Sequence, residues 1–341
     1  MPTPTAFNRR DFLSIAAASA VIAPMSFATA DAHAAQGGGS PPFEVDKRIR
    51  AGVLEVGYHE SGNREGPPVL LLHGWPYAVQ SYADVAPLLA AKGCRVIAPH
   101  LRGHGTTRFL DADTPRSGQQ AAMGAAVIAL MDALKIPRAV LAGFDWGGRA
   151  ACVAAALWPQ RCSGLVSVNS YLIQDIAKAG LPAPAKVEAA FWYQYYFLTE
   201  RGRAGLTANR RDIARIMWAR NSPTWQFDDA TFNRSAAAFD NADFVDVTIH
   251  SYRHRLGAAA GYPVYAELEQ QLALLPVITV PTITMDGDAD GVVAATDGKS
   301  TAPKFSGERQ HRVIPGIGHN PPQEAPAAFA AAVWELASKS R

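Results

Sequence analysis

A carboxylate stands at the centre of a short glycine-rich motif, G-F-D-W-G-G at 143–148, in which the acidic residue is Asp145. The preceding segment, 138–142, is apolar like a buried strand, and the following segment, to about Leu157, is small and apolar like a packed helix. A strand, a tight G-x-D-x-G turn and a helix form a nucleophile elbow, which lifts one side chain above a sheet. A hydroxyl or thiol there would favour acyl transfer, whereas a carboxylate indicates attack on a saturated carbon.

Two further signals lie late in the chain. The segment M-D-G-D-A-D at 285–290 follows a predicted strand, and His319 lies in the segment G-I-G-H-N after the last predicted strand. A histidine can take a proton from water, and a carboxylate can orient the histidine and stabilise its charged form. Three carboxylates compete for that second role, those of Asp286, Asp288 and Asp290.

The segments that must position these residues alternate between strands and helices. This alternation predicts an α/β fold, with a mostly parallel sheet flanked by helices. The alternation stops after Ser170 and resumes near Thr282, and the aromatic-rich segment between them is expected to form an inserted helical cap over a covered pocket. We expect strands at 53–58, 69–72, 94–99, 138–142, 164–168, 282–285 and 312–314, and helices at about 81–92, 118–134, 147–157 and 324–338.

The N-terminus resembles a bacterial twin-arginine export signal at 1–34, with the segment N-R-R-D-F-L, an Ala-rich apolar run and a final A-H-A. A retained anchor is the alternative, but Pro24 and Ser26 interrupt a run that is already short for a membrane span. We therefore expect a periplasmic or secreted protein that engages the twin-arginine export machinery and is not stably anchored in a membrane. The remaining chain divides into a linker at 35–46, a first core segment at 47–170, the cap at 171–275 and a second core segment at 276–341.

Composition excludes few functions. The formal net charge of +2 over 341 residues gives no reason to expect binding to nucleic acid. The three cysteines, Cys94, Cys152 and Cys162, fit neither a disulfide framework nor a zinc site, so buried packing is favoured, with a Cys152–Cys162 disulfide left open. We expect neither a metal nor an organic cofactor.

Taken together, the motifs resemble those of the α/β-hydrolase-fold epoxide hydrolases, over about residues 47 to 340. The resemblance is carried by H-G-W-P at 73–76, the elbow, G-D-A-D at 287–290 and G-H-N at 318–320, in the chain order nucleophile, acid, histidine. In this fold the acid usually stands three residues after the glycine that ends its strand, which favours Asp290. The resemblance also implies an oxyanion hole formed by the backbone N–H groups of Trp75 and Trp146.

The cap favours an epoxide substrate. Epoxide hydrolases of this family use two cap tyrosines to protonate the epoxide oxygen, and the matching segments here contain Tyr193 (F-W-Y-Q-Y-Y-F) and Tyr252 (S-Y-R). Such donors are needed because an alkoxide leaves poorly without a proton, whereas a halide does not need one. Tyr195 or Tyr196 could hold the first role instead, and aromatic packing is the alternative role for both matched tyrosines.

The resemblance thus implies that Asp145 forms an alkyl ester with a small apolar epoxide, and that water activated by His319 and Asp290 releases a vicinal diol. A haloalkane or haloacid dehalogenase using the same nucleophile is the main alternative. Haloalkane dehalogenases usually bind halide with Asn or a second Trp, and the Asn follows the His-Gly pair. This chain has Trp75 there, so that alternative would rest on Trp146. Fluoroacetate dehalogenases usually carry arginine directly after the nucleophile, whereas this chain keeps only Arg149, one turn later. A non-catalytic binding protein of the same fold is a third possibility.

Overall fold

A nine-stranded sheet forms the centre of the structure, a computed structural model that describes residues 43–339. The strand order is β1-β2-β4-β3-β6-β7-β8-β9, with β5 paired to β2, and all pairs from β4 to β9 are parallel. The central strands are buried, which explains why they occur in the sequence as continuous apolar runs. The strands are β1 (Lys47–Ala51), β2 (Leu54–Gly62), β3 (Pro68–Leu72), β4 (Arg95–Pro99), β5 (Arg108–Phe109), β6 (Ala139–Gly143), β7 (Cys162–Val168), β8 (Thr282–Gly287) and β9 (Arg309–Ile314).

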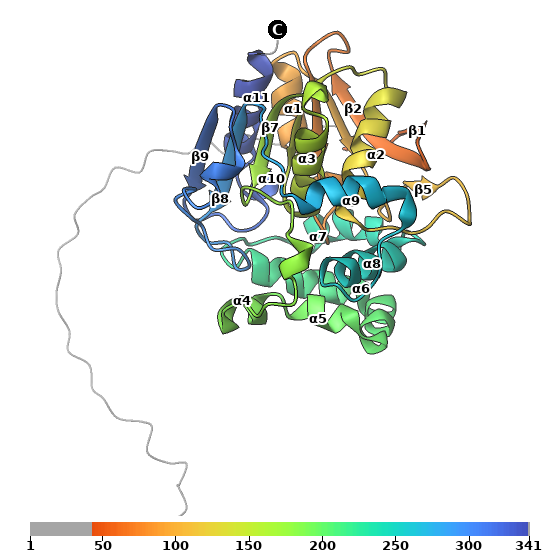
Figure 1. Cartoon of the computed structure of the whole chain (residues 1–341). Coiled ribbons are helices and arrows are strands. Elements are labelled where there is room, and N and C mark those ends of the chain that lie inside the picture. Colours follow the sequence, from red (N-terminus) through yellow and green to blue (C-terminus); the bar gives the residue numbers. More distant parts are fainter. Residues whose placement is uncertain (1–42, 340–341) are drawn as a thin grey trace, which may run out of the picture. The chain divides into compact units, whose positions relative to one another are not determined.

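Helices cover both faces of this sheet (Figure 1). Helices α2 and α3 pack against each other on one face, and α1 and α11 pack against each other on the other. The predicted α/β alternation is therefore confirmed. The core helices are α1 (Val85–Ala91), α2 (Gln120–Ala133), α3 (Asp145–Leu157), α10 (Pro321–Glu324) and α11 (Pro326–Ser338).

The boundaries of several elements differ from the expectation. The antiparallel strands β1 and β5 were not expected, since both are short and carry charged side chains that hide the strand pattern. The helix expected at 81–92 is instead a 3-10 turn, Val79–Tyr82, followed by α1. The predicted export signal, and the predicted linker up to residue 42, lie outside the residues that the structure describes.

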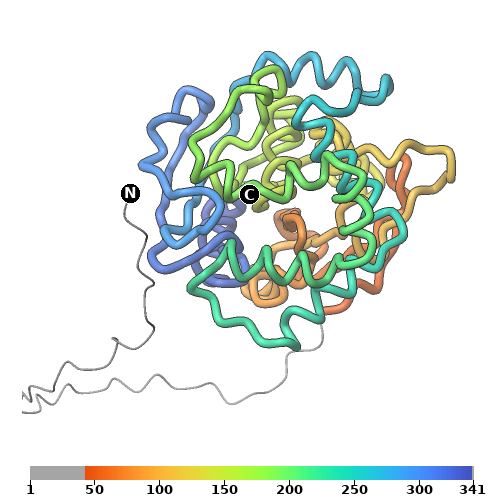
Figure 2. Tube along the Cα trace, turned by 90° about the horizontal axis from the view of Figure 1, so that it is seen from below, coloured from red at the N-terminus to blue at the C-terminus, as the bar shows by residue number. Residues whose placement is uncertain are grey.

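Between β7 and β8 the chain forms only helices. Figure 1 shows them at one end of the sheet, and Figure 2 shows the same green and teal segment, viewed from below, spread across that end. This arrangement places the segment above the nucleophile elbow, which follows the carboxyl end of β6. The helices are α4 (Ala185–Ala190), α5 (Trp192–Leu198), α6 (Glu200–Asn221), α7 (Asp229–Ala236), α8 (Phe244–Arg255) and α9 (Ala266–Ala273).

The fold settles one possibility that the sequence left open, the pairing of Cys152 with Cys162. Cys152 and Cys162 are buried and are not joined to each other: the first thiol lies 3.4 Å from the hydroxyl of Ser167, and the second lies 3.1 Å from the carbonyl oxygen of Gly164. The disulfide that the sequence left open is therefore absent. Within residues 43–339, no helix is both long and apolar enough to span a membrane.

Candidate active site

The elbow places Asp145 at the junction of β6 and α3. Its backbone φ is +50°, in the left-handed region that a non-glycine residue adopts at a cost of about 1–3 kcal/mol. Gly147 makes the turn possible, because a Cβ atom at this position would lie 1.9 Å from the carbonyl oxygen of Leu72 in β3. The glycine of the motif therefore allows α3 to begin directly against the sheet, with the carboxylate facing the cavity beneath the cap.

Two backbone amides donate hydrogen bonds to this carboxylate. The amide of Trp75 donates a hydrogen bond of 2.7 Å to Asp145 Oδ1, and the amide of Trp146 adds a second. Gly74 permits the approach, since a Cβ atom there would lie 2.7 Å from the Cβ atom of Asp145. Burial alone would raise the pKa of Asp145, but the histidine His319 and the two amides outweigh burial and hold the pKa below its usual range. Asp145 is therefore ionised at neutral pH, with Oδ1 in the predicted oxyanion hole and Oδ2 available.

His319 lies between two carboxylates. Its Nδ1 is 2.7 Å from Asp290 Oδ2, and its Nε2 is 3.7 Å from Asp145 Oδ2. Its backbone N–H donates to the hydroxyl of Ser222, a contact of 3.0 Å with the end of α6. Burial disfavours the imidazolium, but Asp290 and Asp145 outweigh burial and raise the pKa of His319 to about 10. The free site therefore holds a charged histidine poised between its two carboxylate neighbours.

Of the three candidate acids, the structure brings Asp290 to the histidine. Asp288 is exposed and accepts a hydrogen bond from the amide of Gly316. Asp286 is buried on β8, where its Oδ2 accepts bonds from the amide and hydroxyl of Thr296, at 2.9 and 3.1 Å. Neither carboxylate contacts His319.

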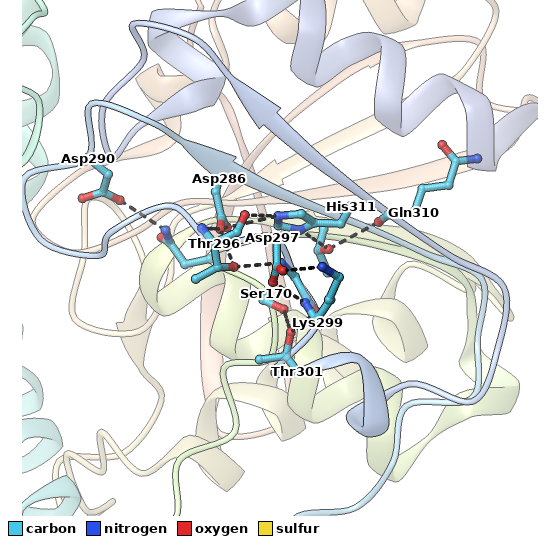
Figure 3. A network of polar contacts seen from close by, with 12 residues as sticks. Ser170, Asp286, Asp290, Thr296, Asp297, Lys299, Thr301, Gln310 and His311 are labelled. Carbon is cyan, nitrogen blue, oxygen red and sulfur yellow. Dashed lines mark hydrogen bonds and ion pairs between the residues drawn. The ribbon is translucent and has the colours of Figure 1, made fainter.

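The loop that carries Asp290 is anchored on both sides. Asp290 Oδ1 accepts the amides of Val292 and Val293, at 2.8 and 3.0 Å, and Oδ2 also accepts the side-chain amide of Asn169, at 3.2 Å. Figure 3 shows Asp286 and Thr296 joined beneath this loop, with His311 beside them. Asn169, directly after β7, was missed by the sequence analysis, because no local motif signals a contact with a residue so distant in the chain.

The cap contributes two buried tyrosines. Tyr193 of α5 and Tyr252 of α8 are 4% and 1% exposed, and their ring centroids lie 5.4 Å apart and 5.6 and 5.3 Å from that of Trp75. Burial and the charge of Asp145 raise the pKa of Tyr193 to about 12, and burial raises that of Tyr252 well above its usual value. Both hydroxyls therefore remain protonated at neutral pH.

The alternative tyrosines of the same segment lie elsewhere. Tyr195 is exposed, and its hydroxyl donates to Glu188. The ring of Tyr196 packs against that of Trp192, its hydroxyl lies beside Gly205, and it does not line the cavity that contains Asp145. The structure therefore brings only Tyr193 of the three to the site.

A cavity of about 100 Å³ lies beside the nucleophile. It is lined by Asp145 and His319 from the core, by Tyr193 from the cap, and by two arginines, Arg149 and Arg255. Sequence reasoning singled out Arg149 only for its spacing from the nucleophile, and it missed Arg255. No group of three or more His, Cys, Asp or Glu side chains suited to holding a metal ion occurs within 43–339. The arrangement can attack an electrophilic carbon, protonate a leaving oxygen and activate water.

Known proteins share the fold of this chain. Residues 67–326 match the protein family described as alpha/beta hydrolase fold. A solved structure of a candidate epoxide hydrolase from Klebsiella pneumoniae subsp. pneumoniae is 54% identical, over 86% of this chain and 97% of that chain, with a TM-score of 0.84. Epoxide hydrolase A from Mycobacterium tuberculosis is 25% identical, over 81% of this chain and 92% of that protein. A candidate epoxide hydrolase from Pseudomonas aeruginosa, 20% identical over 87% of this chain and 98% of that chain with a TM-score of 0.70, shares the fold.

Proposed function

The chain belongs to the α/β-hydrolase fold family, and from this premise we propose that it is an epoxide hydrolase that opens an epoxide to a vicinal diol. The observation that carries the proposal is the pair of buried, protonated tyrosines, Tyr193 and Tyr252, that lies beside Trp75 and within the field of the Asp145 carboxylate. Paired neutral donors suit an oxygen leaving group, which must be protonated as its bond to carbon breaks. The likeness to the Klebsiella and Mycobacterium proteins supports the same reaction.

The first half-reaction forms an ester. Asp145 Oδ2 attacks one ring carbon, and the bond between that carbon and the epoxide oxygen breaks. Tyr193 and Tyr252 hydrogen-bond the departing oxygen, and one of them transfers its proton to it. Asp145 Oδ1 stays against the amide of Trp75 and becomes the carbonyl oxygen of the ester.

The second half-reaction hydrolyses the ester. Esterification removes the negative charge of Asp145, one of the two charges that keep His319 protonated, so the pKa of His319 falls. The imidazolium then gives up its proton, which returns to the tyrosinate left by the first half-reaction, and the neutral imidazole can act as a base. Asp290 holds the ring while Nε2 takes a proton from water, which attacks the carbonyl carbon. The amides of Trp75 and Trp146 stabilise the oxyanion. As the ester C–O bond breaks, the departing alkoxide oxygen takes the second proton of the attacking water and the diol leaves. Asp145 is again a carboxylate, and His319 keeps the proton that it took from water.

A panel of epoxides and chloroalkanes tests the proposal. We expect diol formation from epoxides by the wild-type protein, and a loss of about 100-fold or more in the Tyr252→Phe variant, in line with removal of a general acid. Halide release from chloroalkanes that exceeds diol formation would instead support a dehalogenase. One observation favours that second function: the indole N–H of Trp75 has no hydrogen-bond partner among residues 43–339, and an indole N–H can bind halide. Tight binding of an epoxide without turnover would indicate a binding protein.

We also propose that the protein is exported through the twin-arginine pathway and works in the periplasm or outside the cell. The sequence of the first 34 residues supports this proposal, with its arginine pair at Arg9 and Arg10. A fluorescent fusion of the full chain should leave the cytoplasm, and replacement of both arginines by lysine should retain it there. A fusion that stays cytoplasmic in both forms would contradict export.

For the cap we propose the boundaries 171–275.

A further inference from the structure

Two guanidinium groups line the cavity that contains the nucleophile. Those of Arg149 and Arg255 face the same space as Asp145 and His319. Neither arginine forms an ion pair with a carboxylate anywhere in the described part of the chain, and the two repel each other. The pair has no role in the two half-reactions derived above, so its presence calls for a separate explanation.

Arg149 is directed toward the nucleophile by the geometry of α3. It stands four residues after Asp145, on the same face of the helix, and helical side chains point back toward the helix N-terminus. It is only 8% exposed, and its Nη1 donates to the carbonyl oxygen of Leu172 at 2.5 Å. Its buried Nε has no hydrogen-bond partner within residues 43–339. A buried donor of this kind is unfavourable unless a ligand satisfies it.

Arg255 is fixed from the other side of the cavity, at the end of α8. Its Nε donates to Gln174 Oε1 at 2.8 Å, and Gln174 Nε2 donates back to the carbonyl oxygen of Arg255 at 2.9 Å. The guanidinium carbon lies 5.3 Å from the ring centroid of Tyr252, the proposed proton donor. These contacts set the orientation of the guanidinium through Nε and leave its two terminal nitrogens available for a ligand.

We propose that the epoxide substrate carries a carboxylate, and that Arg149 and Arg255 bind it. This inference rests on the proposed function and adds the class of its substrate. A planar guanidinium fork matches a carboxylate in both charge and shape. A neutral substrate would leave the buried Arg149 and the half-exposed Arg255 without an ion-pair partner.

The charge balance of the site favours an anion. Burial and the charge of Arg255 lower the pKa of Arg149 to about 9, while Asp145 opposes that effect. Ester formation neutralises Asp145 and thereby removes the negative charge that favours the Arg149 guanidinium. A carboxylate on the substrate would supply a negative charge beside Arg149 in place of the one that Asp145 loses.

The dimensions of the site restrict where the carboxylate can be. Arg149 lies four residues after Asp145 in α3, a rise of about 6 Å along the helix axis. A linker between the reacting carbon and the anion must match that short separation, because both groups face the same cavity. The carboxylate therefore belongs on the ring or one carbon away, with an apolar substituent facing Phe191 and Tyr193. The expectation of an apolar substrate then applies to the part of the substrate that contacts these aromatic residues.

Glycidate, an epoxide with a carboxylate on its ring, and its neutral amide glycidamide form a matched pair for the test. We expect the full-length wild-type enzyme to prefer glycidate over glycidamide in kcat/KM by on the order of 100-fold, the effect of one or two charge-assisted hydrogen bonds. Arg149→Met and Arg255→Met should each reduce this ratio at least tenfold, mainly through KM. Arg253→Met is the control, since Arg253 pairs with Glu200 at the surface of α8 and should leave the ratio unchanged.

The outcomes separate this inference from the proposed function. Equal turnover of glycidate and glycidamide by the wild-type enzyme, with a ratio that Arg255→Met does not alter, would overturn the carboxylate site and leave the epoxide hydrolase proposal standing. No diol from glycidate, glycidamide or styrene oxide would overturn the proposed function itself. If Arg149→Met does not fold, two other variants test the inference. Arg255→Met changes a half-exposed side chain, and the conservative Arg149→Lys should keep part of the preference for glycidate.

Discussion

Replacing Asp145 with asparagine should lower the pKa of His319 in the way that esterification does during the reaction. The amide is nearly isosteric with the carboxylate but removes the negative charge 3.7 Å from Nε2. Two unit charges at about 4 Å interact by about 4 kcal/mol in a partly buried site, which is about a thousandfold in proton affinity. The pKa of His319, about 10 in the intact site, should therefore fall toward neutrality in the variant. That change is what turns a charged histidine into a base.

The histidine titration can be followed by NMR in protein with labelled imidazole rings. The His319 signal is identified by its loss in the double variant Asp145→Asn/His319→Gln. Asp288→Asn serves as the control, because this carboxylate is exposed and has no contact with the histidine, so the titration should be unchanged. A His319 that titrates at the same pH in Asp145→Asn as in the wild-type protein would refute the electrostatic account of the second half-reaction.

Three other predictions follow from the geometry of the site. In Asp290→Asn the neutral amide cannot stabilise the imidazolium at 2.7 Å, so hydrolysis of the ester, followed by stopped-flow fluorescence, should slow by about 10³–10⁴-fold while ester formation persists. Gly74→Ala should lower kcat by about 100-fold, since the new Cβ atom would displace the Asp145 side chain; Gly180→Ala, with open space around it, should not. Because folding raises the pKa of His319, its contribution to stability is complete below about pH 6.5 and is lost as pH rises to about 10, so the stability advantage of the wild-type protein over His319→Gln in urea unfolding should decline across that window.

The parts of the site that a local pattern encodes were predictable from the sequence. The elbow is contiguous, and its glycines are demanded by contacts within a few ångströms of the turn, as Gly147 shows. The strand and helix alternation follows from burial on both faces of the sheet. Because the buried strands could be located in this way, the nucleophile and histidine segments could be assigned to strand ends from the sequence alone.

Other parts depend on contacts between segments that are far apart in the chain. Asn169 reaches Asp290 across 121 positions, and Ser222 reaches the His319 amide across 97 positions. Arg255 enters the cavity only because α8 ends there, which depends on how the cap helices pack. Such contacts leave no periodicity or spacing in the sequence, so burial, charge and partners had to come from the structure.

The covalent ester on Asp145 is the central claim, and mass spectrometry of the His319→Gln variant tests it most directly. This variant can form the ester but lacks the base that hydrolyses it. After brief exposure to an epoxide and proteolysis, the account predicts an added mass equal to that of the epoxide on the peptide containing Asp145, and no such adduct in the Asp145→Asn/His319→Gln protein. An unmodified Asp145 peptide, in a variant whose wild-type parent releases diol from the same epoxide, would contradict it.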